Sequence, residues 1–387
     1  MLFKTLARGL ALASLFMTLP TYAANFLSST PGSLQTIRAL GLGEAVTAVA
    51  DDQMALYYNP AGLARLNGWS LEVLNIAGGL NEYTTPTAFM GLAKDFSNAK
   101  DTPSKINVIQ NQLGRNFYTR FMFNPYIVKP GFGLAAMEDF ELNAAINSPK
   151  DNFVDLVLRS DTDLRAGVAI QLFNEKLALG VAGAFRNRIL INGDIGLDKL
   201  TGFLDKSDGR STIDKLKDMG ASGAGVGWDL GMLLTPWETW KPTLGVSVLN
   251  FADTILWANR LGKTIANEEA APLPQSVNAG ISLTPTVPLG WFGTLFGRAS
   301  LDMRDINLPL PASHKWRLGL EGGWDHLATA QLGYSEGSWT AGFEIRMYII
   351  NLRFATYKVE RGYYAGDASE RRYLAGFKFL LDRKSVV

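Results

Sequence analysis

The stretch Trp316-Arg-Leu-Gly-Leu-Glu-Gly-Gly-Trp324 decides the fold of this chain. Apolar residues occupy alternate positions up to Leu320, and arginine, glycine and glutamate stand between them. A period of two is typical of a β-strand with one apolar and one polar face. The same alternation recurs at 164–172, 177–186, 226–234, 243–249, 277–283, 297–304, 328–334, 339–347 and 373–379. The pattern predicts one large antiparallel sheet.

The composition of the two faces favours a membrane barrel over a soluble β-sandwich. A sandwich would bury its apolar face in a core, but here glycines and charges of both signs crowd the polar face. Aromatic residues such as Trp324 and Trp339 stand at segment ends, where interface girdles are expected. We therefore predict an all-β fold, a transmembrane antiparallel β-barrel of about 14 strands, with roughly 12 to 16 admissible.

The first residues indicate export. Lys4 and Arg8 form a positive region, Gly9 to Leu19 is apolar, and Ala23 closes a small-residue cleavage site. This order is typical of a signal peptide, and the apolar run is shorter than the roughly 17–25 residues of a spanning helix. An exported β-barrel implies the bacterial outer membrane.

Composition excludes several function classes. Cysteine is absent, which removes disulfides, thiol catalysis and cysteine–metal sites. The 37 basic and 36 acidic residues leave a net charge of +1, whereas direct nucleic-acid binding needs a clustered basic surplus.

Residues 24–66 differ from the rest of the chain. They are rich in small residues and lack the period of two. Ala45 and Val49 fall at helical spacing and predict a short helix suited to close packing against a wall. We therefore divide the chain into a signal peptide (1–23), an N-terminal helical plug in the lumen (24–66) and the outer-membrane barrel (67–387).

A short motif closes the plug. Asp51 or Asp52 can cap a second short helix, and Asn59-Pro60 ends it, because proline disfavours the α conformation of the preceding residue. The plug motif comprises Asp51, Asp52, Asn59, Pro60, Ala61 and Gly62. We expect it to seat the plug as a rigid turn, and the alternative is a functional gate.

The connections alternate in length. Residues 189–222, 252–274 and 360–370 are long, whereas 173–176 and 236–241 are tight, as in barrels with long external loops and short periplasmic turns. Linker 97–116 departs from this alternation. Linker 189–222 carries Ile213, Leu216 and Met219 at helical spacing, which predicts a short helix.

Charged residues fall on the polar face of the predicted strands. These lumen charges are Arg165, Arg186, Asp229, Arg298, Asp302, Arg304, Arg317, Glu321, Glu344, Arg346 and Lys378. Since buried charges must be paired, we expect them to pair with one another in a narrow lumen. The alternative is a charged channel lining or a latch for the plug. A glycine of the same face, Gly319, is expected to accept a small polar residue.

Nothing in the sequence suggests an enzyme. His314 and His326 are the only histidines, and they lie at opposite ends of one predicted strand, too far apart to share a metal. No recognisable serine–histidine arrangement accompanies them. We predict no catalytic residue, no metal site and no cofactor.

Three strings in the N-terminal region carry a family resemblance. They are Arg38-Ala-Leu-Gly-Leu-Gly43, Ala48-Val-Ala-Asp-Asp52 and Tyr57-Tyr-Asn-Pro-Ala-Gly-Leu63. Together they resemble the long-chain fatty acid transporter (FadL-like) superfamily, and most closely its PorV-like and TraF-like relatives. The resemblance implies the barrel, the internal plug and the outer membrane.

Two functions fit these features. The first is a channel for passive uptake of small hydrophobic or amphipathic molecules. The second is a non-transporting barrel that serves as an accessory platform for an envelope machine, in protein secretion or TraF-like conjugative transfer. The partners expected are outer-membrane lipids together with hydrophobic small molecules or an envelope protein complex, and no nucleic acid directly.

Overall fold

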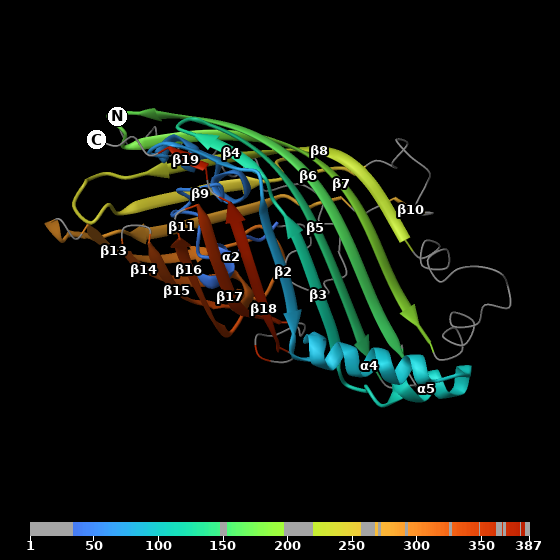
Figure 1. Cartoon of the computed structure of the whole chain (residues 1–387). Helices are drawn as coiled ribbons and strands as arrows, with labels where there is room; N and C mark the ends of the chain where they lie inside the picture. Colours follow the sequence, from blue (N-terminus) through green and yellow to red (C-terminus); the bar gives the residue numbers. More distant parts are fainter. Residues whose placement is uncertain are drawn as a thin grey trace.

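The chain folds into a closed antiparallel β-barrel (Figure 1). The computed structural model describes residues 34–147, 153–196, 220–256, 268–269, 272–290, 293–324, 327–347, 349–360, 366, 369–379 and 381–383. These residues form fourteen barrel strands, and the barrel closes where β18 (Ser369–Phe379) pairs with β2 (Asn75–Asn81). The predicted fold class and strand number are confirmed. The signal-peptide prediction for residues 1–23 lies outside the described residues.

Four of these barrel strands carry two labels. Three of them are β1 (Trp69–Glu72) with β2, β3 (Asn116–Phe123) with β4 (Tyr126–Lys129), and β11 (Ser276–Leu283) with β12 (Thr286–Pro288). The fourth is β18, which is continued by β19 (Leu381–Arg383), and β10 (Glu268–Glu269) adds a short parallel pairing to β8. The remaining strands are β5 (Phe132–Ile146), β6 (Val154–Leu172), β7 (Leu177–Ile195), β8 (Gly220–Leu234), β9 (Thr243–Leu249), β13 (Thr294–Met303), β14 (Trp316–Trp324), β15 (Ala328–Ser335), β16 (Ser338–Met347) and β17 (Ile350–Glu360).

The helices are short and lie at the N-terminus and in the connections. They are α2 (Ile37–Gly41), α3 (Ala55–Tyr58), the 3-10 helices η1 (Pro60–Arg65) and η2 (Glu82–Thr84), α4 (Pro86–Asn98), α5 (Thr102–Gln110) and α8 (Ala312–Lys315). Within the described part of the chain, no helix has the length and apolar character needed to cross a membrane.

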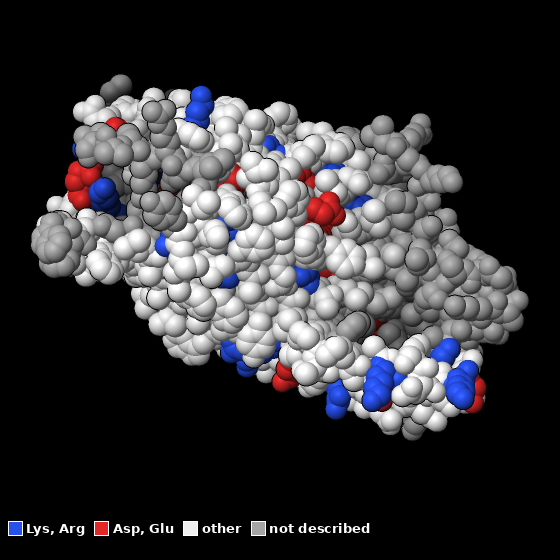
Figure 2. Space-filling view, viewed as in Figure 1, with Lys and Arg blue, Asp and Glu red and all other residues white. Residues whose placement is uncertain are grey.

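The outer surface of the barrel is apolar. Leu320 of β14 pairs with Leu332 of β15, and both side chains are more than half exposed. The neighbouring Arg317 and Glu321 point the other way and are buried. In the middle of the face in Figure 2 uncharged side chains dominate, while charges gather along α4 and α5. An apolar outer band on a closed barrel is the surface that a lipid bilayer covers, so the strands span a membrane.

The two ends of the barrel differ. At the short-turn end, residues 130–131 and 173–176 join consecutive strands. At the long-loop end, the connection 82–115 contains α4 and α5. The linker 97–116 therefore belongs to a long connection and follows the alternation of long and short connections, from which the sequence pattern had excluded it. The sequence reading missed β2, whose two central glycines weaken the apolar period.

One side of the wall is taller than the rest. β6 and β7 each span 19 residues and project beyond the other strands at the long-loop end (Figure 1). The predicted segment 177–186 ended too early, and the predicted linker 189–222 begins as strand. Its predicted helix around Leu216 lies outside the described residues. α5 packs Ile106 and Ile109 against this extension.

The second predicted plug helix is present as α3, which ends at Tyr58 before Asn59 and Pro60, but the first does not lie where the spacing placed it. The first is α2, which begins after Thr36, whose hydroxyl accepts a hydrogen bond from the Ala39 N–H. Gly43 and Glu44 follow with positive φ values of 61° and 62°, so the chain turns before Ala45 and the expected helix there is wrong. Asp52 precedes α3, and its Oδ1 accepts a hydrogen bond of 2.8 Å from the N–H of Met54, the residue before the helix.

Candidate functional site in the occluded lumen

Residues 34–66, hereafter the plug, lie inside the barrel. α2 packs against β15 to β18, and η1 packs against β5 to β8 on the opposite side. Nearly all plug side chains are buried, including Leu42, Met54 and Leu56 at 0% exposure. A segment without strand periodicity thus forms the centre of the apolar core, which places the predicted plug region within the lumen.

Strand glycines let the plug approach the wall. A Cβ on Gly180 of β7 would lie 2.3 Å from the Pro60 carbonyl carbon, and one on Gly333 of β15 would lie 2.3 Å from the Gly43 nitrogen. The glycines whose Cβ would similarly crowd the plug are Gly133, Gly167, Gly231, Gly245, Gly280, Gly319, Gly342 and Gly376. These glycines of the polar strand face therefore form the surface on which the plug packs, hereafter the glycine seat. A larger side chain at any of these positions would displace the plug.

Asn59 joins the plug to the wall. Its Nδ2 donates to the Thr47 carbonyl at 2.8 Å and to the Met232 carbonyl of β8 at 3.2 Å, and its Oδ1 accepts from the Ala61 N–H. Pro60 begins η1. Gly62 is required because a Cβ there would lie 1.9 Å from the Ala50 carbonyl oxygen. This geometry is that of a rigid turn that seats the plug.

Arg38 is the centre of an ion-pair network at the plug surface. Its guanidinium bonds Glu321 of β14 through two contacts of 2.7 Å, and it also bonds Asp51 and Asp52 at 2.7 and 2.9 Å. Arg298 of β13 bonds the same Glu321 and Asp51. The sequence predicts Glu321 and Arg298 as lumen charges and Asp51 and Asp52 as part of the plug motif. It does not predict a role for Arg38, which stands out only as the first residue of a string that resembles FadL-like proteins.

A second network surrounds Glu44, which follows α2 in the chain. Glu44 of the plug forms ion pairs with Arg304 at 3.2 Å and with Arg317 at 3.8 Å. Arg317 continues to Glu336 at 3.0 Å. Asp302 accepts a hydrogen bond of 2.6 Å from the Thr47 N–H. In both networks, lumen charges of the wall take their partners from the plug.

A third network belongs to the tall wall itself. Asp163 bonds Arg165 at 2.7 Å and Arg186 at 2.9 Å, and Arg165 reaches Asp229 of β8. Arg165 also donates to the Leu56 carbonyl of the plug at 3.0 Å. Further inward charges that the sequence reading missed are Arg120, Asp139, Glu141, Arg159, Asp161, Arg188 and Arg372. Extending the alternation through 155–163 and 186–195 would have found three of them, Arg159, Asp161 and Arg188.

The remaining predicted lumen charges lie near the short-turn end. Lys378 bonds Glu72 of β1 at 2.9 Å. Glu344 accepts from Asn351 of β17, and Arg346 is half-buried opposite Asn351 in the β16–β17 register. All the predicted lumen charges therefore belong to the inner side of the wall.

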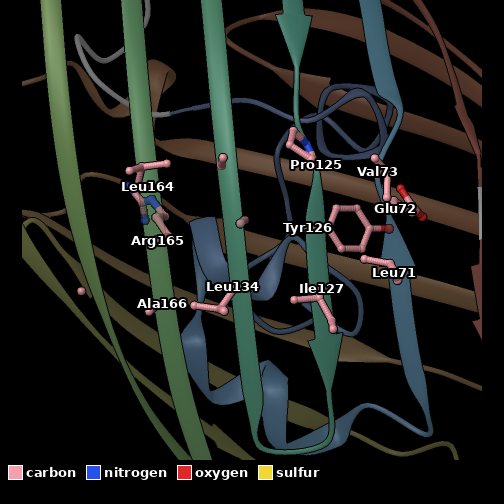
Figure 3. A pocket seen from close by; sticks show the side chains of 13 residues that line it. Leu71, Glu72, Val73, Pro125, Tyr126, Ile127, Leu134, Leu164, Arg165 and Ala166 are labelled. Carbon is pink, nitrogen blue, oxygen red and sulfur yellow. The ribbon is translucent and has the colours of Figure 1, made fainter.

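A hollow of about 530 Å³ opens in the wall beside the interruptions of the first two barrel strands. Leu134, Ile127 and Leu164 line its outer part, and Figure 3 shows Tyr126 and Arg165 bordering it from the strands β4 and β6. Breaks at 73–74 and 124–125 leave the ladder incomplete there. The hollow is a depression in the lipid-facing surface that reaches lumen-facing residues.

The site offers no metal-binding cluster among the described residues. His314 lies in α8, and His326 lies outside the part of the chain that the structure describes. The fold and its interior define a class: a transmembrane β-barrel whose lumen contains its own N-terminal segment.

Solved structures resemble this barrel, although no family model and no curated protein matches the sequence. The CymD monoaromatic hydrocarbon channel is 10% identical with a TM-score of 0.49, covering 89% of this chain and 98% of that one. The Pseudomonas putida toluene transporter TodX is 9% identical with a TM-score of 0.45, covering 88% and 96%. A Pseudomonas aeruginosa FadL homologue is 11% identical with a TM-score of 0.44, covering 92% and 98%.

Proposed function

We propose that this protein is a bacterial outer-membrane channel for passive uptake of small hydrophobic or amphipathic molecules. The observation that carries the proposal is the hollow in the wall. Its volume lies within the range of small-molecule sites, and apolar side chains such as Leu134 and Leu164 line it. The plug closes the axial path, so an apolar solute that enters the barrel meets lipid most directly through this part of the wall.

The resemblance of the N-terminal strings to FadL-like proteins supports the same function. The solved structures named above include a monoaromatic hydrocarbon channel and a toluene transporter. Closeness to PorV-like or TraF-like relatives belongs to the second candidate, a platform for an envelope machine. The observation that favours this candidate is the set of ion pairs that fix the plug, above all Arg38 with Glu321.

Filling the hollow tests the channel function. Ala166 lies on its outer edge, and Ala166→Phe should occupy the space without touching the plug. Ala341 of β16 faces outward away from the hollow, so Ala341→Phe is the matched control. In cells that express each variant, we expect Ala166→Phe to lower the uptake of the apolar dye Nile red and Ala341→Phe to leave it unchanged. Equal uptake by both variants and by the parent would contradict the channel.

Deletion of the plug does not separate the two functions. Glu321 and Arg304 take their partners Arg38 and Glu44 from the plug, so a barrel without residues 34–66 loses these pairs as well as the blocking segment. We expect a raised conductance in planar bilayers after deletion whether or not the intact protein transports. Uptake by the full chain, with the hollow open or filled, is therefore the decisive measurement.

A further inference from the structure

The lipid-facing surface of the tall wall carries a polar group that the barrel itself does not require. Glu138 of β5 occupies an outward position, because it lies in one row with Leu134 and pairs in register with Thr162 of β6. Its carboxylate accepts hydrogen bonds from the Ser160 hydroxyl at 2.7 Å and the Thr162 hydroxyl at 2.6 Å. Figure 2 shows small groups of acidic atoms within the mostly uncharged middle of the face.

Apolar residues flank this group on both sides along the strands. Outward Phe140 and Leu142 follow Glu138 on β5, and Ala136 and Leu134 precede it. The carboxylate therefore has apolar outward neighbours on both sides along its own strand. A charged group on the lipid face is costly, and its presence there indicates a function.

The carboxylate is only partly satisfied. A carboxylate offers about four lone-pair positions, and Ser160 and Thr162 use two of them. Among the residues that the structure describes, no cation forms an ion pair with Glu138. The neighbouring carboxylates of the inner face, such as Asp139 and Glu141, have arginine partners. Glu138 thus retains acceptor positions and, within the described part of the chain, lacks a cationic partner.

The hollow in the wall begins next to this group. Ala136 and Leu164 line the hollow, and Glu138 and Thr162 are the next outward residues on the same two strands, about 7 Å further along. An apolar space and a carboxylate are therefore contiguous on one surface. The molecule that complements both has an apolar body and a hydrogen-bond-donating, positively charged end.

We propose that Glu138, Ser160 and Thr162 form the head-group site of a lipid-facing pocket that binds amphipathic molecules with a primary ammonium group. The apolar body lies in the hollow, and the ammonium donates to the Glu138 carboxylate. This inference deepens the proposed channel function by naming a class of solute, and it rests on that function for its biological role. A fatty acid, whose carboxylate would face Glu138, is disfavoured at the same place.

The wall contains a second hollow that serves as an internal control. It measures about 480 Å³ and is lined by Leu320, Leu332 and Ala330 among others. Its carboxylate is Glu321, which points inward and is paired with Arg38 and Arg298. The second hollow thus has a similar volume and apolar lining but no outward acceptor group of this kind.

Photolabelling of the full-length protein in lipid vesicles tests the proposal. Three diazirine-bearing probes of equal chain length are compared, an alkylamine, an alkane and an alkyl carboxylate, and the labelled peptides are mapped by mass spectrometry. We expect the alkylamine to label 132–137 and 164–166 in preference to 297–299 and 330–332, and the alkane to label both hollows alike. Glu138→Gln should reduce the preference of the alkylamine for the first hollow by about tenfold, because a hydrogen bond to a charged group typically contributes about this much to binding.

Heat-modifiable migration on gels checks that the Glu138→Gln barrel is folded, and alkane labelling checks that its hollow is intact. Labelling by the alkylamine that is equal at both hollows, or unchanged in Glu138→Gln, would overturn the proposal. Because labelling measures binding alone, a protein that imports no apolar dye can still bind the alkylamine, and the failures of the two proposals are distinguishable.

Discussion

The Arg38 guanidinium of the plug holds the Glu321 carboxylate of β14 through two parallel hydrogen bonds of 2.7 Å each. Glu321 is fully buried at its side chain and is shared with Arg298 of β13. A bidentate arginine–carboxylate pair combines charge with fixed geometry. It therefore sets both the position and the orientation of α2 against the wall.

Loss of the Glu321 charge should loosen the plug. Glu321→Gln leaves Arg38 and Arg298 close together without their shared carboxylate, and breaking a buried pair in this way costs about 3 kcal/mol. We expect faster proteolysis within residues 34–66 and larger current fluctuations in planar bilayers. Glu344→Gln is the control, since the Glu344 carboxylate accepts from Asn351 of the wall. Equal protection of the plug in both variants would refute this role.

The glycine seat predicts a contrast between two strand glycines. A Cβ on Gly180 would lie 2.4 Å from the Ala61 nitrogen, whereas a Cβ on Gly78 of β2 meets nothing within 4 Å. We expect Gly180→Ala to lower the free energy of unfolding by about 1–3 kcal/mol through overpacking, and Gly78→Ala to be nearly neutral. Urea titrations of both variants in vesicles measure the difference, and the idea fails if their midpoints coincide.

The orientation of β14 predicts a second contrast. Leu320 faces lipid, so Leu320→Arg should destabilise the barrel by about 2–4 kcal/mol if it lies near the midplane. The structure argues against the expectation that Gly319 accepts a small polar residue, because a Cβ there would lie 2.7 Å from the Ser300 hydroxyl and 2.8 Å from the Leu42 carbonyl oxygen. Gly319→Ser should therefore also destabilise, while outward Gly322→Ser should not. A refolding titration that ranks Gly322→Ser as the most harmful would show a register shifted by one residue.

Acid should weaken the plug through Glu44. Burial raises the pKa of Glu44, but the adjacent Arg304 and Arg317 outweigh burial and lower the pKa below its ordinary value. A group with a lowered folded-state pKa contributes stability above its unfolded pKa of about 4.3 and loses it as the pH falls through the folded pKa. Plug protection from protease should thus be constant from about pH 8 to about pH 5 and decline in stronger acid. Glu44→Gln should remove this part of the decline, and an unaltered profile would exclude Glu44 as its source.

The outer surface of the barrel predicts the cellular location of the protein. The apolar outer band predicts that the protein fractionates with outer membranes and migrates anomalously on gels unless it is boiled. Density-gradient fractionation of the expressing bacterium checks this, with a periplasmic protein as the reference. Recovery in the soluble periplasmic fraction would be incompatible with a membrane barrel.

Local sequence was sufficient for much of the fold. The alternation in Trp316–Trp324 determined β14 without help from any other segment, because a period of two can place Leu318 and Leu320 on one face only in an extended chain. The small residues and the missing period before residue 66 likewise separated the plug from the strands. Weakly alternating β2 and the exact helix in the plug were missed, since glycine and positive φ values at Gly43 and Glu44 override local spacing.

The contact partners of the charged and small residues were decided only by the closed barrel. Arg38 and Glu321 are 283 residues apart in sequence, and their contact depends on strand register and on the pairing of β18 with β2 that closes the wall. The hollow beside Glu138 depends on breaks in two different strands and on the neighbours that those breaks expose. A periodic sequence determined which side each residue faces, because the pleat is local, whereas its partner across the lumen was decided by barrel closure, because closure joins segments that no local pattern relates.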